Sequence, residues 1–102
     1  MEYIVSPIEE RRQSIMACYI ISYDLRKDRD YESLYEAIKS YGTWAHITES
    51  TWAVVTSQTA VQVRDYLLSH MDQDDGLFVV KSGIEAAWKN VICRSQWLKD
   101  NL

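Results

Sequence analysis

The feature that most constrains the fold is the eight-residue stretch from Cys18 to Leu25, which reads CYIISYDL. Isoleucine and tyrosine dominate it, and a carboxylate, Asp24, comes near its end. This pattern predicts a core strand with an acid at its exit. Because a strand end holds a side chain rigidly at the edge of solvent, Asp24 is the first candidate functional residue. The alternative is structural, since acids after strands often form turns or cap helices.

Size and composition predict a single domain, because 102 residues allow one modest core and not two. The formal net charge of −4 argues against a general nucleic-acid binder, so any contact with a polynucleotide must be local. The two cysteines have no CxxC spacing, which favours a reduced, cytoplasmic setting over a disulfide framework. No apolar run approaches the roughly 18 residues of a membrane span, so no membrane contact is expected.

The first fifteen residues are predicted to be an extension that precedes a domain over 16–102. Ser6-Pro7-Ile8-Glu9 is a capping box with proline at the first helical position, which predicts a short helix to about Ile15. Because Met16 directly precedes the first strand, two translation starts remain open, Met1 and Met16, and the extension is a leader or a docking arm.

The rest of the chain alternates helical and extended patterns. Asp30 is a suitable N-cap for the first helix, and Gly42 supplies its stop. Thr59 has capping-box spacing at the start of the second helix. The predicted elements after the first strand are a helix over 31–41, a hairpin of strands over 44–48 and 51–56, a helix over 58–71, a strand over 77–81, and a tail over 84–102 that is helical in its last part.

This order, βαββαβ plus a C-terminal tail, is typical of the ferredoxin-like, split βαβ class of α+β domains. Such a domain has an antiparallel sheet with two helices on one face. The predicted strands are apolar at successive positions, as at Ile20 and Ile21 or Val54 and Val55, so both faces of the sheet need cover. Two helices cover one face, and the other must be met by the tail, by a second copy of the sheet, or by both. We therefore expect a homodimer.

Several short motifs together carry a family resemblance. They are a strand ending Tyr23-Asp24-Leu25, an arginine-rich loop, the run Glu49-Ser50-Thr51-Trp52 before a β-rich segment, and a closing Leu77-Phe78-Val79-Val80 strand. Over about Met16 to Leu102 the chain resembles the small CRISPR-associated second core protein (Cas-two) and its VapD-like toxin relatives, in particular the Cas-two-like proteins labelled SinR family in bacteria and phages. It differs from them in its acidic balance, its N-terminal extension and its tryptophan-rich tail.

The resemblance implies a homodimer whose sheets face one another, with Asp24 near its symmetry mate to hold Mg²⁺ or Mn²⁺. Some members of this family cleave RNA or DNA with that metal, and others bind DNA as scaffolds without needing the acid. Ser50 matches a family serine tied to the hairpin and the dimer contact, where Trp52 also lies. Tyr23 matches an aromatic residue found beside the acid.

Three cations follow Asp24 at once and are candidates for binding a substrate's phosphates: Arg26, Lys27 and Arg29. Asp28 and Asp30 interleave with them and nearly cancel their charge, so a solvated loop is the alternative. With Tyr23, these three residues form the predicted substrate-binding set.

For the other candidate residues, the sequence favours a structural role over a functional one. Trp44 and Trp52 could stack on bases, but aromatic residues of a half-buried sheet more often fill a core. His46 and His70 are widely separated and are expected to be structural. The acids at 72, 74 and 75 lack the spacing of a calcium loop and indicate a helix stop.

Two function classes remain open. The first is a metal-dependent endonuclease that cleaves RNA or DNA through Asp24 of both protomers. The second is a non-catalytic module that engages a protein, a small ligand or a nucleic-acid backbone, for example in phage defence, counter-defence or a toxin–antitoxin pair. Its contact surface would be the N-terminal helix or the tail around Trp88 and Trp97.

Overall fold

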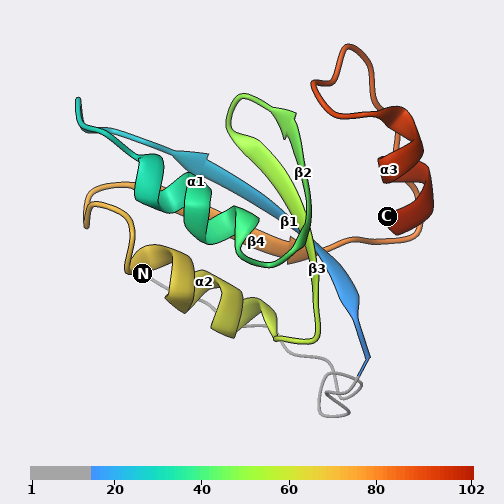
Figure 1. The fold of residues 1–102 in the computed structure, drawn as a ribbon, viewed down its shortest axis with the longest axis horizontal. Coiled ribbons are helices and arrows are strands. Elements are labelled where there is room, and N and C mark those ends of the chain that lie inside the picture. The colour runs from blue at the N-terminus through green and yellow to red at the C-terminus, as the bar shows by residue number, and fades with distance from the viewer. Residues whose placement is uncertain (1–14) are drawn as a thin grey trace.

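The computed structural model describes residues 15–102 (Figure 1). The predicted helix over 6–15 and the extension that contains it lie outside the described residues, apart from Ile15. The elements are β1 (Ala17–Asp24), α1 (Glu32–Lys39), β2 (Thr43–Thr48), β3 (Thr51–Thr56), α2 (Ala60–Leu68), β4 (Gly76–Lys81) and α3 (Ser95–Asn101).

The four strands form one antiparallel sheet in the order β2-β3-β1-β4. β1 lies inside the sheet between β3 and β4, and β2 and β4 are its edges. The predicted α+β class and the antiparallel sheet are confirmed. The predicted core strand that begins near Cys18 is therefore a central strand of the sheet.

One face of the sheet packs against α1 and α2, which lie next to each other in Figure 1. The side chains at alternate positions of β1 point to this face because successive strand residues alternate between faces. They are Tyr19, Ile21 and Tyr23, and they share one buried cluster with Trp52 and Val54 of β3, Leu34 and Ile38 of α1, and Val63 and Leu67 of α2.

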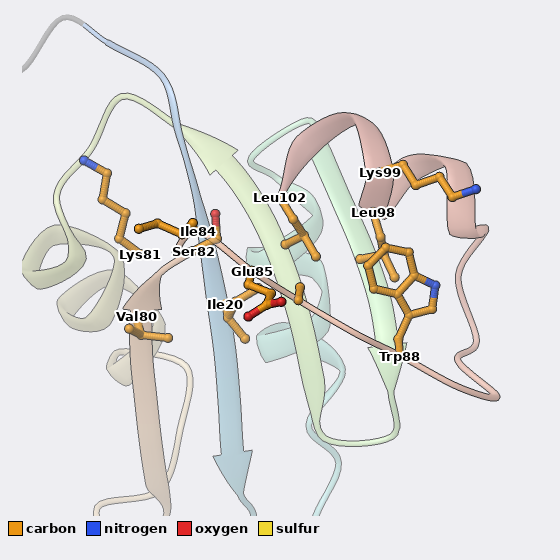
Figure 2. A pocket seen from close by; sticks show the side chains of 12 residues that line it. Ile20, Val80, Lys81, Ser82, Ile84, Glu85, Trp88, Leu98, Lys99 and Leu102 are labelled. Atoms are coloured by element: carbon orange, nitrogen blue, oxygen red, sulfur yellow. The ribbon is translucent and has the colours of Figure 1, made fainter.

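The C-terminal tail lies over the opposite face, as Figure 2 shows. Leu98 of α3 is only 1% exposed, and Ala45 and Ala53 of the sheet are buried. The tail is fastened to the β2 edge, where the backbone N–H of Ile92 donates to the carbonyl oxygen of Ile47 at 2.8 Å. Toward the β4 edge the cover is incomplete, because Phe78 is 62% exposed.

The predicted helix caps and stops are found at the ends of α1 and α2, with one exception. Thr59 forms the predicted capping box with Gln62, and Gly42 follows α1 with a φ of 87°. The N-cap of α1 is Tyr31 and not Asp30. The Asp30 carboxylate still caps a free donor, because the backbone N–H of Glu32 donates to it at 2.8 Å. Both helices are a few residues shorter than predicted.

Cys18 and Cys93 are both free thiols, and burial raises the pKa of Cys18. Over residues 15–102, no helix has the length and apolar character that crossing a membrane requires.

Candidate functional site

Asp24 is the last residue of β1 and pairs across the sheet with Gly76, the first residue of β4. Its side chain is 72% exposed. Asp24 shares the strand parity of Ile20 and Ser22, so its carboxylate belongs to the tail-covered face of the sheet. It lies at the end of that face where Phe78 is also exposed, since Phe78 pairs with Ser22 in the register of β1 and β4.

The three predicted phosphate-binding cations each face an acid. Arg26 Nε donates to Asp24 Oδ2 at 3.2 Å, forming both a hydrogen bond and an ion pair. The other two cations pair with the loop between α2 and β4. Those contacts are Lys27 Nζ to Asp74 Oδ2 at 2.8 Å and Arg29 Nη1 to Asp72 Oδ2 at 3.9 Å. Exposed pairs of this kind are weak, so an incoming phosphate can compete with the acids for the cations.

Asp75, in the loop between α2 and β4, connects that loop to the segment that follows β1. Its Oδ1 accepts hydrogen bonds from the backbone N–H of Arg26 at 2.8 Å and from the Tyr31 hydroxyl at 2.9 Å. Its Oδ2 accepts from the backbone N–H of Asp72 at 2.8 Å. Burial alone would raise the pKa of Asp75, but these donors outweigh it and hold that pKa below its ordinary value. Sequence reasoning took Asp75 only as part of a helix stop, although an Asp-Gly pair directly before a strand signals a specific turn.

Tyr23 does not join Asp24. Its side chain is buried on the helix-covered face, where its hydroxyl accepts from Trp52 Nε1 at 2.9 Å and donates to the Glu49 carbonyl oxygen at 3.1 Å. Burial raises the pKa of Tyr23 to about 12, so the hydroxyl stays protonated. The structure thus places this predicted substrate-binding residue in the core and the three cations at the surface.

Ser50 and Trp52 both lie at the hairpin of β2 and β3. The carbonyl oxygen of Ser50 accepts from the backbone N–H of Tyr23 at 3.1 Å, which ties the turn to β1. Trp52 pairs with His46 across the hairpin, and their rings stack with centroids 4.0 Å apart. Because Trp52 is 3% exposed, its ring fills the core and is not open to a base.

Among residues 15–102 there is no group of three or more His, Cys, Asp or Glu side chains that could hold a metal ion. Asp24 supplies one carboxylate, and Arg26 already engages it. One copy of the chain therefore offers a single, already paired carboxylate at this position. A scan against protein-family models gives no match for this chain.

Proposed function

We propose that this chain is a ferredoxin-like, Cas-two-like homodimer that acts as a metal-dependent endonuclease on RNA or DNA. The fold assignment is supported by the βαββαβ order of β1 to β4. It is also supported by the sheet order, because β3 lies between β1 and β2, the two strands that α1 connects, as a split βαβ arrangement requires.

The observation that carries the proposal is the exposed carboxylate of Asp24 at the uncovered end of the tail-covered sheet face. Phe78 is exposed on the same face and would be buried by a second sheet. Across a two-fold axis there, two Asp24 side chains would repel each other, and a bound cation would relieve the repulsion. Two carboxylates with waters and substrate oxygens are a usual ligand set for Mg²⁺ or Mn²⁺.

In this dimer the metal would polarise the scissile phosphate. The residues of the chain itself would orient the polynucleotide. Arg26, Lys27 and Arg29 lie on one loop directly after Asp24, so they can exchange their acid partners for backbone phosphates. Such contacts would be local, as the net charge of −4 requires.

Cleavage of labelled single-stranded RNA and DNA in Mg²⁺ or Mn²⁺ is the direct test. We expect cleavage that EDTA stops and that Asp24→Ala reduces at least tenfold, because the variant removes the proposed ligand from both protomers. Asp28→Ala is the matched control, an exposed acid in the same loop, and it should cleave as wild type does. Cleavage that persists in Asp24→Ala, or that EDTA leaves unchanged, contradicts the proposal.

The dimer has its own test in analytical ultracentrifugation at micromolar concentration. We expect about twice the chain mass of 11.9 kDa, and a shift to monomer in Phe78→Glu, which puts a charge into the proposed contact. Ile92→Glu is the control, since Ile92 is also 62% exposed but lies in the tail near β2. A wild-type monomer at every concentration rules out the shared metal site.

The second candidate function is a non-catalytic Cas-two-like binding module. One observation favours it: Arg26, Lys27 and Arg29 each already have an acid partner, which weakens the positive field that a nucleic acid would meet. A dimer that shows no cleavage in either metal supports this candidate over the nuclease. Its partner would then be a protein, a small ligand or a nucleic-acid backbone.

A further inference from the structure

A cavity of about 530 Å³ lies on the tail-covered face, between the β1–β4 pair and the C-terminal tail (Figure 2). Ile20 of β1 and Val80 of β4 come from the sheet, and Trp88, Leu98 and Leu102 come from the tail. The volume falls within the roughly 300–1,000 Å³ of small-molecule sites, and these five side chains make it largely apolar. Its size and lining suit one small ligand.

The tail is fastened on both sides of this cavity. Where it leaves β4, the backbone N–H of Ser82 donates to the Cys18 carbonyl oxygen at 2.8 Å. On the other side, the backbone N–H of Ile92 donates to the Ile47 carbonyl oxygen at 2.8 Å. Within the tail, Trp88 Nε1 donates to Ser95 Oγ at 3.2 Å, which links the lining ring to the start of α3. Leu98 is almost fully buried. A cavity with walls held in this way is formed before a ligand arrives, which lowers the entropy cost of binding.

The charged side chains that line the cavity point in different directions relative to it. Figure 2 shows the carboxylate of Glu85 turned over Ile20 toward the middle of the cavity, while the side chains of Lys81 and Lys99 carry their ammonium groups away from it. In the part of the chain that the structure describes, Glu85 has no hydrogen-bond or ion-pair partner. The charge offered to a ligand is therefore negative, and its complement is a cation.

We propose that this cavity binds a small organic amine with an apolar aryl or alkyl body. The ammonium group pairs with Glu85, and the apolar body lies over Ile20 and Val80 against Trp88. The site is separate from Asp24, which lies roughly 13 Å further along β1 at about 3.3 Å per residue. The proposal of an amine site is therefore independent of whether the chain is a nuclease.

Three probes with the same apolar body test the proposal by NMR titration of the full chain: 4-phenylbutylamine, 4-phenylbutan-1-ol and 5-phenylpentanoate. The amine should shift the amide signals of Ile20 and Val80 and the indole signal of Trp88. It should bind roughly two- to fivefold more tightly than the alcohol, which is the gain in affinity that an exposed ion pair gives. The acid should bind most weakly, because its charge repels Glu85.

Two variants assign the preference to Glu85. Glu85→Gln should bring the amine to the affinity of the alcohol and leave the affinity of the alcohol unchanged. Glu32→Gln, an exposed acid at the start of α1 on the other side of the sheet, should keep the preference for the amine. Equal binding of amine and alcohol to wild type, shifts centred away from the cavity, or no shift at millimolar amine would each overturn the proposal.

Discussion

Trp52→Ala should lower the free energy of unfolding by about 3–5 kcal/mol, the usual cost of removing a buried large aromatic side chain. Trp52 is 3% exposed and contacts several aromatic rings, among them His46, Trp44 and Tyr35, with centroids at 4.0, 5.5 and 6.2 Å. It also donates the hydrogen bond to Tyr23. Urea unfolding followed by circular dichroism measures the change without relying on tryptophan fluorescence.

Two further variants separate the packing of Trp52 from its hydrogen bond. Trp52→Phe keeps an aromatic ring and loses the N–H donor, so it should cost less than Trp52→Ala and remain measurable if that variant does not fold. Trp44→Ala removes a neighbouring ring that is 36% exposed and should cost about 1 kcal/mol. If Trp52→Ala cost no more than the ~1 kcal/mol expected for Trp44→Ala, Trp52 would not be a main stabiliser of the core.

The sequence predicted the sheet well because strand and cap signals are local. The run at β1, the hairpin of β2 and β3, and the capping box at Thr59 all appear where their residue types indicated. The apolar residues at successive strand positions also indicated that both faces need cover. They could not show how far the tail alone supplies it, since that depends on where Leu98 packs in three dimensions.

The candidate site was less predictable, because its geometry joins loops that are distant in sequence. The strand pattern placed Asp24 at an exposed exit, and the structure agrees. The pairing of Lys27 with Asp74 and the role of Asp75 depend on β4 lying beside β1. The family resemblance groups Tyr23 with Asp24, but adjacent residues of a strand point to opposite faces of the sheet.

Asp75→Asn should destabilise the chain by about 1–2 kcal/mol at pH 7, because it weakens charge-assisted hydrogen bonds that join two loops. The Asp75 carboxylate accepts from Arg26, Asp72 and Tyr31 at 2.8–2.9 Å. Asp74→Asn is the matched control, since Asp74 is 56% exposed and its ion pair is with Lys27 alone. It should cost less than about 1 kcal/mol.

The pH dependence of the same variant gives a sharper test of Asp75. Its pKa in the folded chain lies below the ordinary value of 3.8, so its carboxylate form is favoured by folding. The stability it adds is fully present above pH 3.8 and is lost as the pH falls through the lower folded pKa. Urea unfolding at a series of pH values should therefore give a constant difference between wild type and Asp75→Asn from about pH 7 to 5, and a shrinking one below about pH 4. A difference that stays constant down to pH 2 would mean that the charge of Asp75 does not stabilise the loops.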